Sequence, residues 1–348
     1  VLVNEWVINA RTPRRIQVRS DDGTALAGRM IPGTKRLRPW VLLLHGFGGS
    51  WRDSLAFSRI YAAHDCNIML VDMRAHGESE GEWTGSGWLD RRDIIAWCSW
   101  IIARTGEEAQ IIIHGTGMGA TAALFAAQEK DFPAQARAIV SDSAYIDIWN
   151  ETALRLGNGF AKPQPMLDLC RTMLRKSKGG YDLGKGNILP GIPGISTPLF
   201  IMHGEEDACT PPYMGIYLAM AAGCDVDTIV DAVTAKQVMA DIAKLKTEAN
   251  NDDKAERDRD NTTSKSSNDA SRESFTDSPE DDLLDLIVDQ PPTEDETPTG
   301  SEASPYIAAS PTGNMFFFAP SAGHCQASFA CPTSYENALN TFLDRCIG

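Results

Sequence analysis

The residues best placed to do chemistry lie in a glycine-rich turn, 115–119, with the sequence Gly-Thr-Gly-Met-Gly. An apolar β-branched run, Ile111 to Ile113, precedes the turn, and small residues from Met118 to Gln128 predict a helix after it. Strand, tight turn and helix in this order form a nucleophile elbow, G-x-S-x-G, in which a strained turn presents a serine at the top of a sheet. Gly117 occupies the position of that serine. The turn is therefore predicted to be an elbow without its hydroxyl nucleophile.

A carboxylate that could serve such an elbow follows a later strand. The predicted strand 198–202 leads into residues 203–207, His-Gly-Glu-Glu-Asp. We favour Asp207 over Glu205 and Glu206 because it lies just before the loop turns into a helix. A buried carboxylate there would fix the tautomer of a histidine and stabilise its cation. Capping the helix from solvent is the simpler alternative role.

One histidine lies where a general base is expected. Of the six histidines, only His324 falls in a loop between the last predicted strand, 315–318, and the last predicted helix, 334–346. An imidazole in hydrogen-bond reach of a reacting group can take up its proton. A turn histidine without a catalytic role is the simpler alternative.

A second glycine-rich turn follows the first long apolar strand, 40–44. Its sequence is His45-Gly46-Phe47-Gly48-Gly49. The backbone N–H of Phe47 would join that of Met118 around a developing negative charge, as in an oxyanion hole. We also place His45, Gly46, Trp51 and Trp83 at the pocket. The large aromatic side chains would form an apolar wall, although core packing is their commoner fate.

The same glycines also fit a dinucleotide-binding fingerprint, Gly115-x-Gly117-x-x-Ala120. The turn would then hold a pyrophosphate at the helix N-terminus, and Asp142, at the end of the next strand, would bind a ribose. Such a motif usually opens its domain, whereas several strands precede it here. This alternative also leaves Asp207 and His324 without a purpose.

The elements that must position these residues alternate along the chain. A hairpin is predicted over 14–32, because Asp21-Asp22-Gly23 is a strong turn signal. Further strands are predicted at 40–44, 67–71, 111–113, 138–140, 198–202 and 315–318, and helices at 53–64, 87–103, 118–128, from Pro211 onward and at 334–346. Strands that alternate with helices imply βαβ units. The predicted fold class is α/β, with a doubly wound, mostly parallel sheet.

We interpret residues 1–348 as a single domain with two additions. Residues 145–186 have a helical pattern interrupted by prolines and glycines, which predicts a small helical cap. Residues 224–311 are interpreted as an insertion, helical over 226–247 and a disordered acidic loop over 250–304. A strand and a closing helix come after it in the chain, so we prefer an insertion to a linker.

Most of the net charge lies in the acidic loop. Residues 250–304 contain 17 acidic and 5 basic side chains, which accounts for −12 of the net charge of −15. The nearly neutral remainder gives nucleic-acid binding no electrostatic support. An apolar island, Leu283 to Val288, interrupts the acidic loop. Docking on a protein partner is one interpretation of it, and a transient helix is the simpler one.

The eight cysteines include no C-x-x-C pair. Their scatter fits neither a disulfide framework nor a metal site. In an exported protein, Cys325 would be close enough in sequence to pair with Cys331, or Cys331 with Cys346. No apolar run reaches the ~18–20 residues of a membrane span. The start at Val1 is compatible with removal of an N-terminal anchor or signal segment, so localisation and oligomeric state stay open.

Five motifs, in this order, resemble the α/β-hydrolase superfamily, and most closely its bacterial serine-aminopeptidase-like and prolyl-oligopeptidase-like branch. They are His45-Gly46-Phe47-Gly48-Gly49, Asp72-Met73-Arg74-Ala75-His76-Gly77-Glu78-Ser79, Gly115-Thr116-Gly117-Met118-Gly119, His203-Gly204-Glu205-Glu206-Asp207 and Ala322-Gly323-His324. The resemblance covers about residues 14–223 and 312–347. It implies hydrolysis of an ester, thioester or peptide bond in a small acyl or peptide substrate, no cofactor, and a helical cap over the pocket.

The chain departs from this family at Gly117 and in the insertion. Without a hydroxyl at 117, His324 has no group to activate for covalent acyl transfer. The oxyanion hole and binding alone retain ~10³–10⁴-fold over water, so the chain is expected to be inactive or severely impaired. Thr116 is a poor substitute, because its side chain leaves the turn in another direction. Three interpretations remain: a hydrolase whose nucleophile was replaced, a natural pseudoenzyme that binds a ligand or partner, and a site where His324 activates water.

Overall fold

The computed structural model describes residues 13–33, 38–156, 186–227 and 305–347, together with the isolated residues 169, 172, 173 and 176. The chain divides into two units, one formed by Val1–Lys246 with Ser304–Gly348 and the other by Thr247–Ala303. The second unit lies outside the described residues, and so do the predicted acidic loop 250–304, its apolar island and nearly all of the predicted helix 226–247. All the described residues belong to the first unit.

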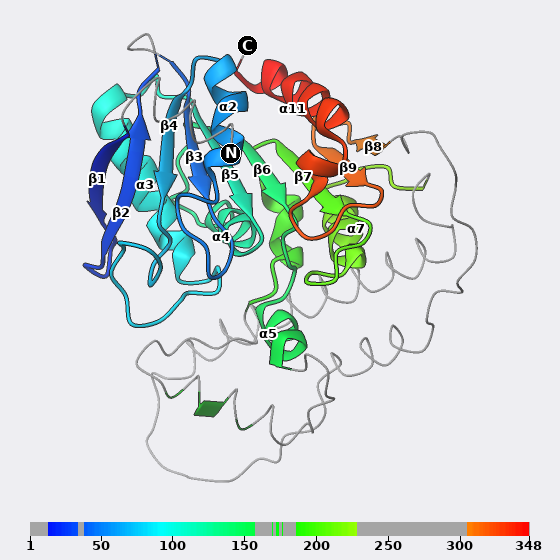
Figure 1. Cartoon of the computed structure of the whole chain (residues 1–348), viewed down its shortest axis with the longest axis horizontal. Helices are drawn as coiled ribbons and strands as arrows, with labels where there is room; N and C mark the ends of the chain where they lie inside the picture. The colour runs from blue at the N-terminus through cyan, green and yellow to red at the C-terminus, as the bar shows by residue number, and fades with distance from the viewer. Residues whose placement is uncertain are drawn as a thin grey trace, which may run out of the picture. The chain divides into compact units, whose positions relative to one another are not determined.

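A nine-stranded sheet forms the centre of this unit, in the order β1-β2-β4-β3-β5-β6-β7-β9-β8 (Figure 1). Neighbours from β4 through β3, β5, β6 and β7 to β9 pair in parallel, and antiparallel pairing is confined to β1, β2 and β8. The predicted mostly parallel sheet is therefore confirmed, as is the N-terminal hairpin. The strands are β1 (Arg14–Arg19), β2 (Ala25–Ile31), β3 (Trp40–Leu44), β4 (Asn67–Val71), β5 (Ile111–Thr116), β6 (Ala136–Asp142), β7 (Leu199–Gly204), β8 (Tyr306–Ala309) and β9 (Met315–Ala319).

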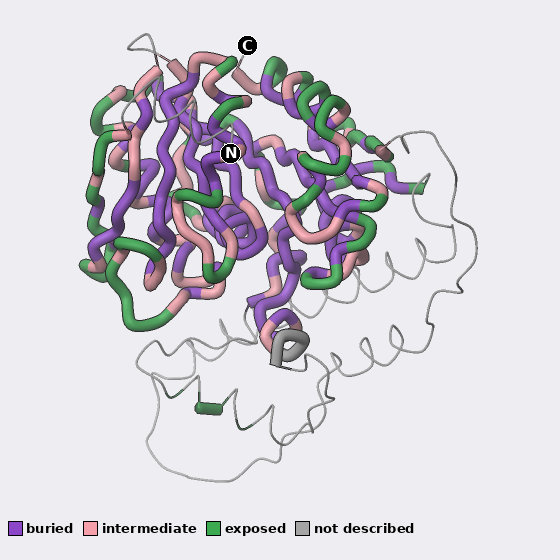
Figure 2. The backbone as a smooth tube through the Cα atoms, viewed as in Figure 1, coloured by how far each residue is buried: buried purple, intermediate pink, exposed green. Residues whose placement is uncertain are grey.

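Helices cover both faces of the sheet, which confirms the doubly wound arrangement. Their bounds are α2 (Leu55–Ala63), α3 (Asp90–Thr105), α4 (Met118–Ala126), α5 (Ile148–Leu156), α7 (Pro212–Ala221), α10 (Ala327–Ala330) and α11 (Pro332–Ile347). Buried side chains of α3, α4 and α7 share one apolar cluster with the sheet, and those of α2 and α11 share another. Strands β3 and β4 are buried at every position, as expected of continuous apolar strands covered on both faces (Figure 2).

Helix α4 packs directly against the sheet because glycines occupy its points of contact. All nine of its residues are buried. A Cβ on Gly119 would lie 2.7 Å from the carbonyl oxygen of Leu44, and one on Gly115 would lie 2.3 Å from the carbonyl carbon of Gly119. Neither contact is tolerable, so glycine at both positions allows the N-terminus of α4 to rest directly on β3 and β5.

The structure contains one strand that the sequence did not predict. Strand β8 pairs antiparallel with β9 inside the range 224–311 that we assigned to the insertion, so the sheet resumes at Tyr306. Only one of its four residues is buried, and such a short edge strand has no clear apolar alternation.

The structure does not test the predicted cap, but it does show the state of the cysteine thiols. Helix α5 begins within 145–186, but most of that range lies outside the described residues, so the cap stays a prediction. The thiols of Cys325 and Cys346 are both free, so neither of the two pairings considered for an exported protein is formed. Among the described helices, none has both the length and the apolar character needed to cross a membrane.

The close approach of α4 predicts a large effect for the substitution Gly119→Ala. The new methyl group would press on the Leu44 carbonyl oxygen, and overpacking of this kind costs about 1–3 kcal/mol of unfolding free energy. Urea denaturation followed by circular dichroism measures the change. Gly194→Ala is the matched control, because a Cβ there meets no atom within 4 Å. Equal stability of the two variants would contradict the packing described for α4.

Candidate active site

Three loops at one edge of the sheet carry the candidate residues. Strand β5 ends at Thr116, β7 at Gly204 and β9 at Ala319. Parallel strands present their carboxyl ends at the same edge, where open α/β sheets bind ligands. Gly117, Asp207 and His324 follow these three ends and are brought together, although Asp207 and His324 are 117 positions apart in the sequence.

The imidazole of His324 is hydrogen bonded to the carboxylate of Asp207, with 2.8 Å between Nδ1 and Oδ2. The Asp207 side chain is completely buried, whereas about a quarter of the His324 side chain (26%) is exposed. The other carboxylate oxygen, Oδ1, accepts the backbone N–H groups of Cys209 and Thr210 at 2.9 and 2.8 Å. A carboxylate can only accept, so Nδ1 carries the proton and the lone pair of His324 resides on Nε2.

Charge within the pair favours an ionised Asp207 beside a basic His324. Burial alone would raise the pKa of Asp207, but hydrogen bonds from His324 and from the N–H of Thr210 outweigh it, and the pKa is lowered. Burial alone would lower the pKa of His324, but its hydrogen bond to Asp207 and the negative charges of Asp207, Asp142 and Glu151 raise that pKa above its usual value. An imidazole in this setting can take a proton from a hydroxyl or water and hold it.

The elbow residue Gly117 faces His324. Its backbone has φ 51° and ψ −114°, a conformation that L side chains rarely adopt, and its N–H donates to the carbonyl oxygen of Asp142 at 2.8 Å. A Cβ at this position would lie 3.2 Å from Nε2 of His324 and 3.8 Å from the Cα of Gly46. A side chain at 117 would therefore point at the free nitrogen of the imidazole, which would have to move by a few tenths of an ångström to admit it.

The loop 45–51 is held beside the elbow by two buried anchors. Nε2 of His45 accepts the backbone N–H of Met73 at 2.9 Å. Oδ1 of Asp72 accepts the backbone N–H of Trp51 at 2.8 Å. Both anchors involve the segment that begins directly after β4, so the motif 72–79 supports the motif 45–49.

The two residues predicted to supply oxyanion N–H groups differ in exposure. Met118 is buried, and its Sδ accepts the hydroxyl of Thr84 at 3.3 Å. The ring of Phe47 is 56% exposed and meets the imidazole of His76 edge-on, with 5.9 Å between ring centroids. Nε2 of His76 also accepts the N–H of Gly48 at 3.1 Å, which braces the tip of the loop. The oxyanion role of Phe47 and Met118 stays a prediction.

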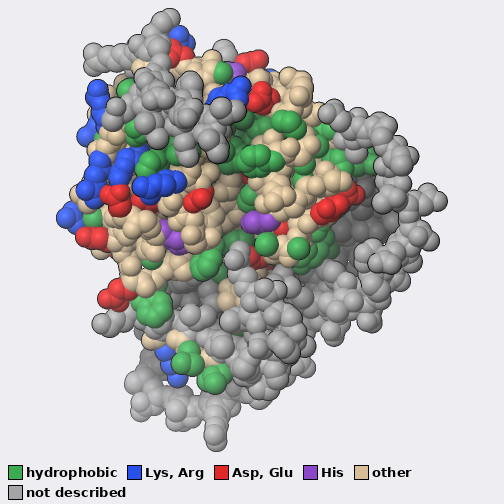
Figure 3. Space-filling view, in the orientation of Figure 1, with side chains coloured by type: hydrophobic (Ala, Val, Ile, Leu, Met, Phe, Trp, Pro, Cys, Tyr) green, Lys and Arg blue, Asp and Glu red, His purple; other side chains and the backbone are tan. Residues whose placement is uncertain are grey.

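Two of the predicted pocket residues have other surroundings than we expected. His45 is completely buried and supports the loop, and burial lowers its pKa. The ring of Trp51 lies against Arg29 and Arg52, whose guanidinium carbons are 5.4 and 4.8 Å from the ring centroid, which is a cation–π arrangement. Trp83, the other aromatic pocket candidate, has 49% of its surface exposed. On the face drawn in Figure 3, Lys and Arg side chains gather on one side, and histidines reach the surface next to them.

Neither the hydroxyl of Thr116 nor the thiol of Cys325 is suited to act as a nucleophile beside His324. Thr116 Oγ1 donates to the carbonyl oxygen of Leu44 at 3.4 Å, so it points toward β3. Burial raises the pKa of the Cys325 thiol well above its usual value, which keeps it protonated and a poor nucleophile.

Sequence reasoning missed two residues that support the site. His203 is buried, donates from Nε2 to the carbonyl oxygen of Thr210 at 2.8 Å, and lies 3.6 Å from Oδ2 of Asp207. Ser143, which directly follows β6, accepts the backbone N–H of Cys325 at 3.1 Å and so contacts the His324 loop. The signal for both was a polar residue at the carboxyl end of an apolar strand.

The ribose-binding role considered for Asp142 does not fit its surroundings. Its side chain is completely buried, and Oδ1 accepts the hydroxyl of Ser143 at 3.1 Å. Burial raises the pKa of Asp142 to about 7. A carboxylate enclosed in this way is not available to a dinucleotide.

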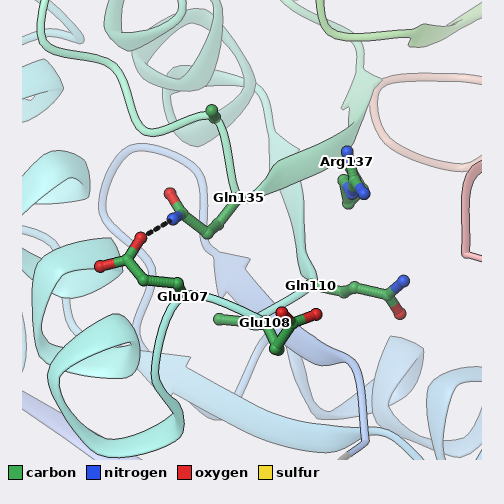
Figure 4. Close-up of a pocket in the computed structure, with 7 residues that line it drawn as sticks. Glu107, Glu108, Gln110, Gln135 and Arg137 are labelled. Carbon is green, nitrogen blue, oxygen red and sulfur yellow. Dashed lines mark hydrogen bonds between the residues drawn. The ribbon is translucent and has the colours of Figure 1, made fainter.

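A polar pocket of about 180 Å³ lies at the opposite edge of the sheet. It is formed by residues just before β5 and around the start of β6, and Nε2 of Gln135 donates to Oε2 of Glu107 across it at 2.8 Å (Figure 4). The amino ends of the strands carry this pocket, so it is separate from the site of Gly117 and His324. Among the described residues, no group of three or more His, Cys, Asp or Glu side chains could hold a metal ion.

Comparison with known proteins supports the resemblance. Residues 41–234 match the model of the alpha/beta hydrolase family. "Uncharacterized protein YqkD" of Bacillus subtilis (strain 168) is 27% identical over 177 residues, which is 49% of this chain and 56% of that protein. "Protein ABHD12B" of Homo sapiens is 27% identical over 181 residues, which is 50% of this chain and 47% of that protein. The chain thus spans about half the length of the curated relatives it matches.

Solved structures show the same fold. The Pyrococcus furiosus esterase Pf2001 in space group P212121 has a TM-score of 0.58 and 18% identity, covering 97% of this chain and 93% of that one. The same esterase in space group C2221 has a TM-score of 0.57 and 16% identity, covering 97% and 92%. Sequence identity this low shows only that the fold is shared. Since the family model spans more than half of the sequence, this chain belongs to the alpha/beta hydrolase family.

Proposed function

We propose that this chain holds the acid–base half of a serine acyl-hydrolase site, with His324 as general base and Asp207 as its orienting acid. Gly117 occupies the nucleophile position, so the chain as written is inactive or severely impaired toward esters, thioesters and peptides. The observation that carries the proposal is the placement of the missing side chain, whose Cβ would lie 3.2 Å from Nε2 of His324.

The geometry fits a two-step acyl transfer once a hydroxyl is supplied at 117. The hydroxyl oxygen would attack the carbonyl carbon while its proton passes to Nε2, and Asp207 would stabilise the resulting imidazolium. The N–H groups of Phe47 and Met118 would hold the negative charge on the carbonyl oxygen. The leaving group then takes the proton from Nε2, and water releases the acyl group by the reverse path. With glycine, the attacking oxygen is absent and no acyl-enzyme can form.

A second candidate is a natural pseudoenzyme that binds a ligand or partner. It is supported by the lack of a reactive side chain at 117, where glycine adopts φ 51° without the strain that a serine carries in an elbow. The intact pair of His324 and Asp207 would then serve to bind rather than to react. In a third candidate mechanism, His324 activates water. The unchanged chain would then hydrolyse its substrate without a covalent intermediate.

Restoring the hydroxyl is the direct test. We expect Gly117→Ser to hydrolyse a short-chain p-nitrophenyl ester ~10³-fold or more faster than the unchanged chain, with a burst of acyl-enzyme detectable by mass spectrometry. Gly117→Ala is the matched control, because it adds the same Cβ without an oxygen. If the serine variant is folded but as slow as the alanine variant, the site is not a nucleophile-deleted hydrolase site.

Both variants should also be less stable than the unchanged chain. A residue with a Cβ at φ 51° is strained, and such strain costs about 1–3 kcal/mol. We therefore expect Gly117→Ser and Gly117→Ala to lower the unfolding free energy by similar amounts in urea titrations. A serine variant as stable as the unchanged chain would show that the elbow relaxes to another conformation.

The charge of Asp207 predicts a pH dependence that needs no catalysis. Because the folded state raises the pKa of His324 above 6.5, the stabilisation from its protonated form is complete below pH 6.5 and is lost as pH rises through the folded pKa. We expect Asp207→Asn to lower the pKa of His324, measured by NMR titration of its ring nitrogens, and to flatten this part of the stability profile. Glu107→Gln, at the opposite edge of the sheet, is the control and should leave the titration unchanged.

A further inference from the structure

Ser143 connects the elbow side of the site with the His324 loop. It follows the last residue of β6, is completely buried, and has φ 54°. Its hydroxyl donates to Oδ1 of Asp142 at 3.1 Å and accepts the backbone N–H of Cys325 at 3.1 Å. Its own N–H donates to the carbonyl oxygen of Met202, in the neighbouring strand β7, at 2.9 Å. Ser143 is thus fixed at three points.

The bond to Cys325 acts on the residue that directly follows His324. Cys325 has φ 54°, so the chain reverses there in a conformation that a non-glycine residue needs support to keep. Because its N–H is held by the hydroxyl of Ser143, the peptide that carries the imidazole has a fixed place relative to the end of β6.

The segment before Ser143 holds the other side of the site. The carbonyl oxygen of Asp142 accepts the N–H of Gly117 at 2.8 Å. Two consecutive residues at the end of β6 therefore contact the elbow through a main-chain carbonyl and the His324 loop through a side-chain hydroxyl. Strand β6 lies between β5, which leads into the elbow, and β7, which leads into the Asp207 loop. Among the described strands it is the one that adjoins both.

We propose that Ser143 is a positioning residue, which sets the distance and angle of His324 relative to position 117 through the N–H of Cys325. A hydroxyl suits this role because it donates to one partner and accepts from another at once. Alanine can do neither, and a β-branched threonine would be strained at positive φ. The structural part of this inference stands on the hydrogen bonds alone, and only its kinetic part rests on the proposed function.

The first test uses the chain as it exists and reads the imidazole directly by NMR. We expect Ser143→Ala to broaden or remove the downfield signal of the His324 Nδ1 proton and to lower the pKa of His324. Ser141→Ala is the matched control, because Ser141 lies two residues earlier, within β6, and its buried hydroxyl has no hydrogen-bond partner among the described residues. It should leave both readings unchanged.

Two more variants separate positioning from other effects. Asp142→Asn removes a charge that acts on His324, beside those of Asp207 and Glu151, but keeps an oxygen for the hydroxyl of Ser143. It should lower the pKa of His324 while the downfield signal stays sharp. Ser143→Gly removes the hydroxyl in a residue that tolerates φ 54°, so it gives the same reading if Ser143→Ala does not fold.

The second test adds Gly117→Ser to each variant and measures ester hydrolysis. Displacement of a reacting group by about 1 Å costs up to about a hundredfold, so we expect Ser143→Ala to lower kcat about ten- to a hundredfold with KM little changed. An altered NMR signal together with an inactive Gly117→Ser chain would refute the proposed function and leave the positioning role standing. A folded Ser143→Ala or Ser143→Gly chain with an unchanged signal and pKa of His324 would overturn the positioning role, whatever the activity.

Discussion

The hydrogen bond between His324 and Asp207 is the contact on which the rest of the site depends. It joins two loops that are far apart in the chain, and it exists only because β7 and β9 are parallel neighbours whose ends are in register, with Gly204 opposite Ala319. The two backbone N–H groups on Oδ1 then hold the carboxylate so that Oδ2 is left for the imidazole. A shift of one residue in that strand pairing would turn the side chains of one strand to the other face of the sheet and displace the loop that follows it.

Hydrogen bonds from main-chain N–H groups to side chains hold the loops of the site together. The N–H groups of Met73, Trp51 and Gly48 each donate a hydrogen bond to a side chain of another loop. The N–H of Cys325 does the same. In a site made of loops, such bonds replace the regular ladder that holds the strands. This explains why several polar residues around the site, among them His45 and Asp72, have their side chains turned to the protein rather than to a substrate.

Much of the fold could be predicted because its signals are local. The apolar strands β3 and β4, the small residues of α4 and the order of the five motifs all lie in short stretches of sequence. The residues that support the site could not be predicted, because their roles depend on contacts between distant loops. Ser143 and His203 resemble ordinary polar residues until their partners are known, and His45 resembles a pocket residue until its burial is known. The edge strand β8 is short and mostly exposed, so it has no pattern to detect.

The conformation of Gly117 has a consequence for the evolution of this position. The position keeps the shape of an elbow and faces an imidazole that is already oriented, so the difference from a nucleophile is a single side chain. Two of the four glycine codons, GGT and GGC, become serine codons by one base change. Where the gene uses either of them, one base change would supply the hydroxyl that the proposed acyl transfer requires. Persistence of glycine at this position over many generations would then not be explained by a lack of mutational access to serine.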